Sequence, residues 1–400
     1  MILYLALPFV FAGLFALSRL IKNEKLRQLL CSLVPALMLF VLLGFKGSTV
    51  GVDSATYVLA YHDLKDVPFF PDPGFFTSLN SYNFKNEYGF IFLAQLFSKF
   101  GLPYLFFQLL LYSVICFSLF YSTWKLSKNP ISSFIVFYCF TFFNFFVSGL
   151  RQSFAVSLCL LAMSLILSGG RTPIRTVLYF TLITIATFWH KSALIFILPF
   201  FLMRAKIGIK GMMILLFVSI FLYIFGAEMY EFINVIVSAA LDGNFGDYAP
   251  FTFGSGLTSL LTIVIIVVAY LIYTPFMWKD KLSAKLYEKL PFLKDKNSDT
   301  EVVEEKKGED YFSFYIIMSF IGVWLSYTNR FSISFGRIAM FFSIFVIFLL
   351  PNSIEKIKNK RIKIIIQITL FVAFVAYFVY TTVLTNYLGI APYRFIEGTL

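Results

Sequence analysis

The sequence predicts an all-α protein that crosses a membrane about twelve times, with both termini outside. Of its 400 residues 59% are hydrophobic and only 14% are charged. The apolar residues form blocks of about 15 to 25 residues, close to the length of a bilayer-spanning helix. A soluble domain of this length cannot bury so much apolar surface. We therefore expect a single integral membrane domain over residues 1–400.

The individual helices follow from the apolar runs between polar turns. The first run leads into a basic loop without a small-residue cleavage site, so we interpret it as a retained helix rather than a removed signal peptide. The expected spans are 2–20, 29–45, 103–124, 131–148, 152–168, 176–189, 191–203, 211–226, 257–278, 312–329, 338–351 and 364–386.

Lysine and arginine set the orientation of these helices, because basic loops stay in the cytoplasm. Basic connections alternate with connections that hold few cations, and most of the 33 lysines and arginines fall on the cytoplasmic side. The net charge of +12 therefore reflects topology, and no nucleic-acid partner is expected. The basic connections lie at Lys22/Lys25/Arg27, Lys125/Lys128, Arg171/Arg175, Arg204/Lys206/Lys210, in the charged cytoplasmic loop 279–311, and at residues 356–363.

Two segments need a separate interpretation. Residues 88–101 are too short and too polar for a span, so we predict a helix in the membrane interface, within an external loop over 46–102. Residues 176–203 are apolar except for His190 and Lys191. One long helix would bury a cation at mid-membrane, so we predict two short helices that meet at the outer side.

With this topology the unusual polar residues collect on the outer side. Asp53, in the run GVDSATY, could take a proton from a sugar hydroxyl, although it could also cap the following helix. Glu87, in EYGF, has the same two interpretations. His190 lies in a long apolar run and could act as a base, as a donor to an oxyanion or as a pyrophosphate ligand. Its alternative is a structural histidine that is hydrogen-bonded between helices.

Several cations accompany these groups. Arg151 follows Gly149 at a predicted helix start, where backbone N–H groups and a guanidinium favour an anion. Arg330 and Arg337 are seven residues apart, about two helical turns, and could share a face. The alternative for all three arginines is contact with lipid phosphates at the interface. The sequence has no HxxxH, DxD or CxxC motif, so we expect no metal or cofactor. Carboxylates, a histidine and cations without a metal suit a substrate that carries a diphosphate on a lipid.

Five motifs in order resemble one family. They are GVDSATY, EYGF, GLRQSFAVSL, FWHKSALIFILP and FGRIAMFFSIF, within about residues 45–345, and the terminal Pro392-Tyr393-Arg394 also fits. Together they resemble the EpsG-like, Wzy-type polysaccharide (O-antigen) polymerases of bacteria. The resemblance implies a GT-C-like, metal-independent membrane glycosyltransferase of the bacterial cytoplasmic (inner) membrane. Such enzymes act in capsule or lipopolysaccharide synthesis and join oligosaccharide repeat units carried on undecaprenyl diphosphate at the outer (periplasmic) face.

The resemblance also implies roles and partners. Donor and acceptor would both be undecaprenyl-diphosphate oligosaccharides in membrane lipid, with a chain-length regulator protein as a further partner. Either Asp53 or His190 would be the base, and Glu87 a further catalytic residue. The remaining matches are Tyr57 and Gln152 as other substrate contacts, and Arg151, Lys191, Arg330 and Arg337 as diphosphate ligands.

The sequence departs from some members of this family. O-antigen polymerases with large periplasmic loops carry an Arg-x15-Gly pattern, and neither Arg151 nor Arg330 has glycine at that spacing. Two other functions stay open at this point. One is a transporter or flippase of lipid-linked oligosaccharides, and the other is an O-antigen ligase.

Overall fold

The structure is a computed structural model that describes residues 2–69, 87–241, 255–277, 311–328 and 333–396. All regular secondary structure in these ranges is helical. The chain divides into two compact units. Unit 1 comprises Met1–Ile197 and Phe371–Leu400, and unit 2 comprises Leu198–Leu370. The charged loop predicted over 279–311 lies almost entirely outside the described residues, as does Arg330.

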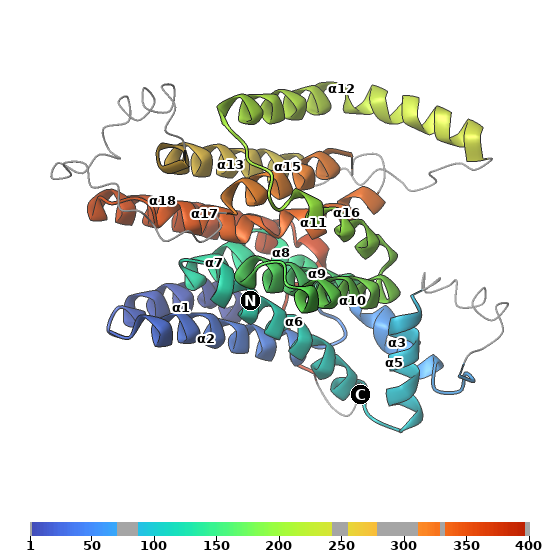
Figure 1. Ribbon diagram of the computed structural model, residues 1–400. Coiled ribbons are helices and arrows are strands. Elements are labelled where there is room, and N and C mark those ends of the chain that lie inside the picture. Colours follow the sequence, from blue (N-terminus) through green and yellow to red (C-terminus); the bar gives the residue numbers. More distant parts are fainter. Residues whose placement is uncertain (1, 70–86, 242–254, 278–310, 329–332, 397–400) are drawn as a thin grey trace. The chain divides into compact units, whose positions relative to one another are not determined.

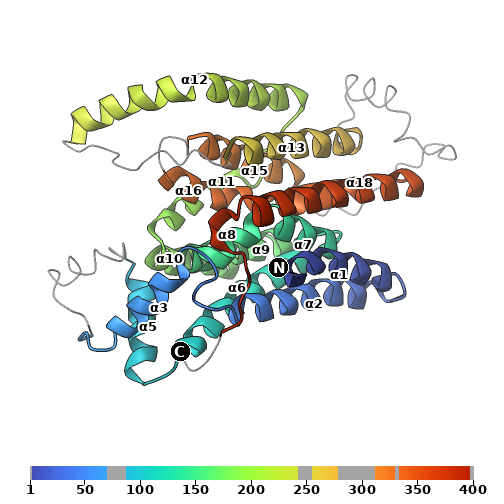
Figure 2. The same cartoon turned by 180° about the vertical axis from the view of Figure 1, so that it is seen from behind.

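Unit 1 is a bundle around one central helix, α9 (Figures 1 and 2). Small residues such as Ser153, Ala155 and Ala162 are fully buried along α9, which lets α6 and α10 pack closely against it. The helices of unit 1 are α1 (Ile2–Ser18), α2 (Glu24–Gly44), α3 (Ser54–Asp63), α5 (Tyr88–Lys99), α6 (Tyr104–Leu126), α7 (Pro130–Cys139), α8 (Phe142–Ser148), α9 (Leu150–Gly169), α10 (Pro173–Trp189), a 3-10 helix Lys191–Ile197 and the second half of α18 (Lys360–Phe378), which continues as a π-helix over Val379–Leu384.

Polar caps explain where three of these helices begin. The side chains of Asn23, Asn129 and Thr172 accept hydrogen bonds from backbone N–H groups in the first turns of α2, α7 and α10. Pro130 and Pro173 then occupy the first helical position, where the missing N–H costs no hydrogen bond.

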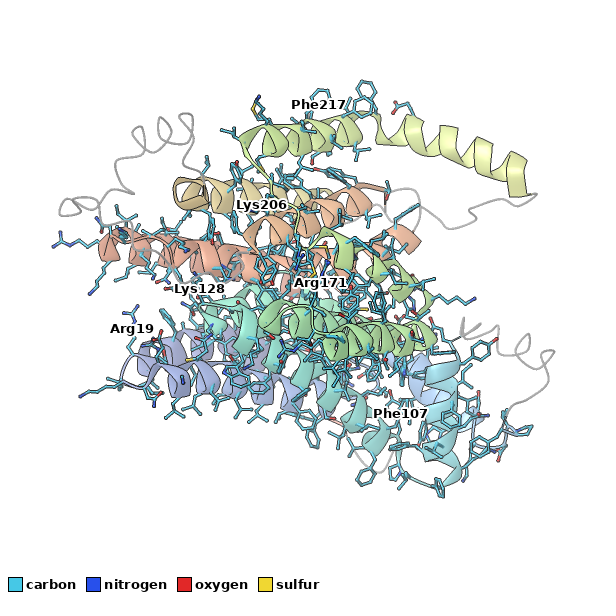
Figure 3. All side chains as sticks on the ribbon, viewed as in Figure 1. Arg19, Phe107, Lys128, Arg171, Lys206 and Phe217 are labelled. Atoms are coloured by element: carbon cyan, nitrogen blue, oxygen red, sulfur yellow. The ribbon has the colours of Figure 1, made fainter. Side chains whose placement is uncertain are left out.

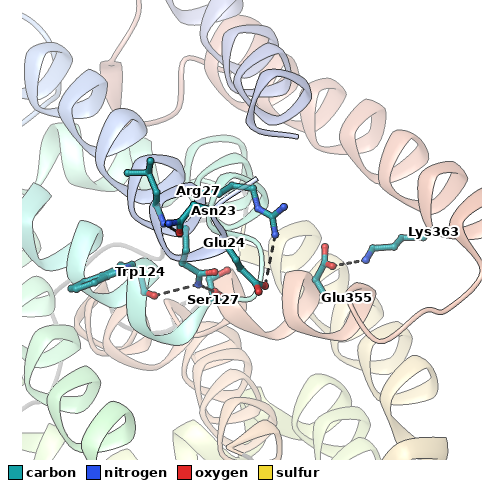
Figure 4. Close-up of polar contacts among 9 residues, drawn as sticks. Asn23, Glu24, Arg27, Trp124, Ser127, Glu355 and Lys363 are labelled. Carbon is teal, nitrogen blue, oxygen red and sulfur yellow. Dashed lines mark hydrogen bonds and ion pairs between the residues drawn. The ribbon is translucent and has the colours of Figure 1, made fainter. Parts of the chain in front are cut away.

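Unit 2 is held by close helix contacts and a few polar bonds. A Cβ atom on Gly322 of α15 would lie 2.8 Å from the backbone nitrogen of Ser343 in α16, so glycine permits this close approach. Trp324 Nε1 donates to Ser219 Oγ over 2.8 Å. Glu355 and Lys363 form an ion pair (Figure 4). The helices of unit 2 are α11 (Pro199–Leu202), α12 (Ile209–Leu241), α13 (Ser255–Met277), α15 (Phe312–Thr328), α16 (Ile333–Ser343), α17 (Val346–Ile354) and the first half of α18.

The helices confirm a polytopic membrane protein. Six helices are long and apolar enough to cross a bilayer, or seven if the bent pair α7 and α8 forms one span. Five shorter apolar helices, including Ile2–Ser18 and Phe312–Thr328, fall at other predicted spans. The expected number of about twelve therefore stays a prediction.

Two predicted spans differ from the structure. The span expected over 131–148 is bent by 65° between α7 and α8, where Thr141 has a left-handed backbone with φ of 63°. The span expected over 191–203 is not one α-helix, because it consists of the 3-10 helix Lys191–Ile197 and the four-residue α11. The break predicted at His190 is confirmed.

Two basic connections lie together at one end of unit 1. Gln28 Nε2 donates to the carbonyl oxygens of Trp124 and Ser127, which joins the start of α2 to the end of α6 (Figure 4). Arg19 and Lys128 lie at this end, whereas Phe107 lies at the opposite end (Figure 3). The predicted grouping of the first two basic connections is therefore confirmed.

The opposite end of unit 1, here called the motif end, holds residues 45–54, 87–90, 147–152 and 189–190. Residues 387–396, here called the C-terminal strap, bind the first of these segments. Gly47 N donates to Arg394 O (2.9 Å), Gly51 N to Gly389 O (3.0 Å) and Val52 N to Leu388 O (3.1 Å). Tyr393 and Tyr4 pack with ring centroids 5.2 Å apart, so the start of α1 lies at this end as well.

The helix expected over 88–101 is present as α5. It runs across the direction of α9 and α10 in both views (Figures 1 and 2) and is not among the candidate spans. It buries Phe90, Ile91 and Ala94 against its neighbours. Its location in the membrane interface stays a prediction that this orientation supports.

Candidate functional site

One carboxylate joins three of the sequence motifs at the motif end. Glu87 Oε2 accepts a hydrogen bond from a terminal guanidinium nitrogen of Arg151, and Glu87 Oε1 lies 2.7 Å from His190 Nδ1. The three side chains are only 9%, 12% and 12% exposed, respectively. We call Glu87, Arg151 and His190 the site cluster. Each comes from a different motif, and 64 and 103 residues separate Glu87 from its two partners.

Glu87 stands directly before α5, but its side chain does not cap that helix. The capping alternative is therefore wrong for Glu87. Asp53 has the same position before α3 and also makes no side-chain cap. Neither carboxylate therefore serves as a helix cap.

Arg151 is the second residue of α9. The first hydrogen bond of this turn runs from Ser153 N to Gly149 O over 2.8 Å, so the N–H groups before Ser153 have no partner within the helix. The guanidinium carbon lies 5.5 Å from the ring centroid of Tyr57 and 5.8 Å from that of Phe90. Aromatic faces attract a cation, and they also keep water from it. Arg151 is therefore held within unit 1 and turned toward Glu87 rather than toward lipid phosphate.

His190 stands where the chain reverses. Its backbone is extended, with φ of −157° and ψ of 114°, and ends α10. The following 3-10 helix packs back along α10, and Tyr179 OH donates to Phe196 O over 2.6 Å. Because Glu87 engages Nδ1, the other ring nitrogen, Nε2, is the one left for chemistry. Nε2 is buried and has no hydrogen-bond partner among the described residues.

Tyr57 and Asp53 extend the cluster toward α3. Tyr57 is 3% exposed, and burial raises its pKa, so the phenol stays neutral. The charges of Arg151, Asp53 and Glu87 all act on the Tyr57 hydroxyl, which places it among them. Asp53 is therefore near the site cluster, one helical turn before Tyr57.

The remaining predicted residues divide by location. Gln152 is 5% exposed at the start of α9, next to Arg151. Lys191 is exposed at the start of the 3-10 helix and is not in the site cluster. Arg337 is exposed on α16 of unit 2, and Arg330 falls outside the described residues. The structure thus brings together Glu87, Arg151, His190, Tyr57 and Asp53, while the roles of Lys191, Arg330 and Arg337 stay predictions.

Sequence reasoning missed three supporting features. One is Lys46, a fully buried lysine beside Asp53. The others are the aromatic surface of Phe90 and Trp189, whose ring centroids are 6.0 Å apart, and the C-terminal strap. The sequence does hold a signal for Lys46, because this lysine follows an apolar run and lies seven residues before Asp53 of the motif GVDSATY. Nothing in the sequence pairs the strap with residues 45–52.

The arrangement of the site cluster suits proton transfer next to a bound anion. In the described part of the chain, no group of three or more histidine, cysteine or acidic side chains could hold a metal ion. A histidine held by a carboxylate through Nδ1 can accept a proton at Nε2, because the carboxylate orients the ring and stabilises the charged imidazolium. A buried arginine at a helix start adds donors for an oxyanion. These groups together could bind a charged leaving group and deprotonate a hydroxyl.

Comparisons with known proteins indicate one family. No curated protein and no solved structure matches the chain. A model of one protein family, the EpsG family, matches residues 29–395, which include every member of the site cluster and nearly the whole C-terminal strap. This match confirms the resemblance drawn from the five motifs. The chain therefore belongs to the EpsG family.

Proposed function

We propose that this protein polymerises oligosaccharide repeat units carried on a lipid diphosphate, by metal-independent glycosyl transfer at the outer face of the bacterial cytoplasmic membrane. Membership of the EpsG family supports a polysaccharide polymerase role in a membrane. The observation that carries the proposal is the site cluster, in which Glu87 holds both Arg151 and His190. Undecaprenyl diphosphate is the expected carrier of both donor and acceptor.

His190 is the base in this proposal. Nε2 takes the proton from the acceptor hydroxyl while that oxygen forms a bond to the anomeric carbon of the donor. The bond from this carbon to the diphosphate oxygen breaks, and the lipid diphosphate leaves as an anion. Glu87 keeps the imidazole oriented through Nδ1 and balances the positive charge that forms on the ring. Asp53, the other base left open by the sequence, lies a turn away beside Tyr57.

Arg151 binds the leaving diphosphate in this proposal. In the structure Glu87 Oε2 accepts from the Arg151 guanidinium, so the carboxylate holds the place of an anion. Arrival of the diphosphate would displace Oε2 from Arg151 while Oε1 stays with His190. The aromatic rings around the guanidinium exclude water, which strengthens its attraction for the diphosphate. Lys191, Arg330 and Arg337 are proposed as further cations for the same group.

The test is gel analysis of surface polysaccharide from a deletion strain that expresses single variants. Arg151→Ala, Arg337→Ala and His190→Gln should each abolish long polymer and leave single repeat units, with normal protein level in the membrane. Arg27→Ala removes an arginine of similar kind at the opposite end of unit 1 and should leave polymer length unchanged. Normal polymer in both Arg151→Ala and His190→Gln would refute the assignment.

The same gel separates the other functions. Loss of a flippase would leave no repeat units at the surface, because none would reach the outer leaflet. Loss of a ligase would leave full-length polymer on its lipid carrier and none on the final acceptor. Only loss of a polymerase leaves single units on the final acceptor.

The expectation of metal independence has its own measurement. Polymer formation in membrane vesicles that hold the native lipid-linked units should continue in excess EDTA. Complete loss in EDTA that added divalent metal restores would show that a metal takes part.

A further inference from the structure

Lys46 is a buried lysine that the proposed reaction has not yet used. It follows α2 and is 3% exposed. Its Nζ donates to Val50 O over 3.1 Å and to Ser54 Oγ, and Ser54 Oγ in turn donates to Val50 O over 2.6 Å. Burial of an ammonium group is costly, so a lysine in this place needs a compensating role.

The bonds of Lys46 close the loop that carries the first motif. They connect the end of α2 with the first residue of α3, across residues 47–53. The closed loop lies against the end of α8, because a Cβ on Gly51 would meet the Cα of Ser148 at 2.9 Å. Gln108 holds the other side, since its Nε2 donates to Gly44 O (2.9 Å) and Lys46 O (3.0 Å).

Lys46 is also connected with the site cluster through Asp53 and Tyr57. The Asp53 carboxylate acts on both Lys46 and the Tyr57 hydroxyl, and the charges of Arg151 and Glu87 act on Tyr57 as well. Within the described residues, Asp53 is the one charged group whose field acts on Lys46.

We propose that Lys46 is a positioning residue for the glycosyl transfer, whose ammonium group fixes the 47–54 loop so that Tyr57 lies against Arg151 and Asp53 lies beside Tyr57. Lys46 is buried and touches no substrate, so it acts through these two residues. The proposal rests on the proposed function, because it assigns Lys46 to the same reaction. It predicts that the charge of Lys46 matters, and not only its packing.

The pH dependence of the reaction tests the charge. Burial lowers the pKa of Lys46 to about 7, although Asp53 opposes this shift. The ammonium form is therefore present below this pH and is lost as pH rises through it. Other titratable groups on the packed elements include Tyr57 of α3 and Tyr387, Tyr393 and Arg394 of the strap. The phenols stay neutral in this range, because burial raises the pKa of these tyrosines, and arginine keeps its charge.

The experiment measures polymer formation as a function of pH in membrane vesicles that carry the native lipid-linked units. Wild-type activity should decline as pH rises through about 7. Lys46→Arg keeps the charge at every pH and should move this decline to much higher pH. Lys46→Met should reduce activity roughly ten-fold or more below about pH 7, where the wild-type lysine is charged, and should differ less from wild type at higher pH. Ser54→Ala should reduce activity less than Lys46→Met, because Val50 O still accepts from Nζ.

Lys99→Met is the matched control, since it removes a half-buried lysine of α5 that is not in the site cluster and whose Nζ donates to Lys65 O. It should keep wild-type activity and pH dependence. Wild-type activity in Lys46→Met, or the wild-type alkaline decline in Lys46→Arg, would overturn the proposal. Loss of polymer in His190→Gln together with either result would leave the proposed function intact. Normal polymer in His190→Gln and Arg151→Ala would refute the proposed function itself.

Discussion

Gly89 and Trp189 approach each other more closely than any other residue at position 89 would allow. A Cβ atom on Gly89 would lie 2.8 Å from Trp189 Cδ1 and 3.1 Å from Phe188 O. This approach joins the start of α5 to the end of α10. It therefore sets the distance between Glu87, two residues before the glycine, and His190, directly after the tryptophan.

We expect Gly89→Ala to move α5 away from α10 and to lengthen the bond between Glu87 and His190. Polymer length on the gel should fall to single units, while the protein still reaches the membrane. The change also costs folding stability, on the order of 1–3 kcal/mol for overpacking. Gly13→Ala is the control, because no atom lies within 4 Å of a Cβ built there. If Gly89→Ala retains full polymer, the contact does not set the site.

Glu87→Gln separates binding from turnover. The amide still fills the space of the carboxylate, but it no longer competes as an anion for Arg151 and no longer balances a charged His190. We expect pyrophosphate, used as a probe of the anion site, to bind the purified variant more tightly than wild type. Polymer formation should fall by roughly 10²-fold or more, the usual worth of a positioned acid–base group. Weaker pyrophosphate binding in Glu87→Gln would contradict the idea that Glu87 holds the place of the diphosphate.

The stability of the folded protein should change with pH through Lys46. Its pKa is 10.5 in an exposed state and about 7 in the folded state, so between these values the unfolded chain binds more protons. The free energy of unfolding should therefore rise as pH increases across this window, and it should be lowest below the window. Each unit of the pKa shift corresponds to about 1.4 kcal/mol. Melting temperature in detergent at several pH values checks this.

Lys46→Met should flatten that pH dependence and raise the melting temperature at neutral and acid pH. A more stable but less active variant would show that the lysine is retained for the reaction. A melting temperature that depends on pH as in wild type would mean that another group is responsible.

Tyr179→Phe tests the chain reversal at His190. The change removes the hydroxyl that donates to Phe196 O and leaves this buried carbonyl without its partner, which costs about 1–3 kcal/mol. We expect a lower melting temperature and shorter polymer, because the 3-10 helix no longer holds His190 firmly. Tyr380→Phe is the comparison, since that tyrosine is 40% exposed. Equal effects of the two changes would show that the bond to Phe196 O has no special role.

Much of this arrangement could be predicted from the sequence. Long apolar runs predict the membrane spans, and basic connections predict which span ends share a side of the membrane. On that basis Glu87, Arg151 and His190 were expected on the outer side, and the structure brings them into contact at one end of unit 1. The bend at Thr141 could not be predicted, because no proline or glycine marks it. The 3-10 form of Lys191–Ile197 was also missed, since its residues are as apolar as those of a normal span.

The contacts of Glu87 with Arg151 and His190 could not be predicted from the sequence, for a different reason. Each of Glu87, Arg151 and His190 had a separate local explanation, namely a helix cap, a lipid contact and a structural hydrogen bond. Only the fold shows that Glu87 contacts both Arg151 and His190. Lys46 was overlooked because lysines often follow apolar runs. Its burial involves the strap, since Lys46 and Phe395 form an isolated antiparallel β-bridge between distant parts of the sequence.

The strap has a consequence for biosynthesis. The amides of Gly47, Gly51 and Val52 bond to carbonyls of residues 388–394, which are synthesised long after them. The loop that carries the first motif can therefore complete its hydrogen bonds only after the helices between it and the strap have been made. Its folding is coupled to that of the strap, so a change that displaces the strap should also disturb residues 47–52.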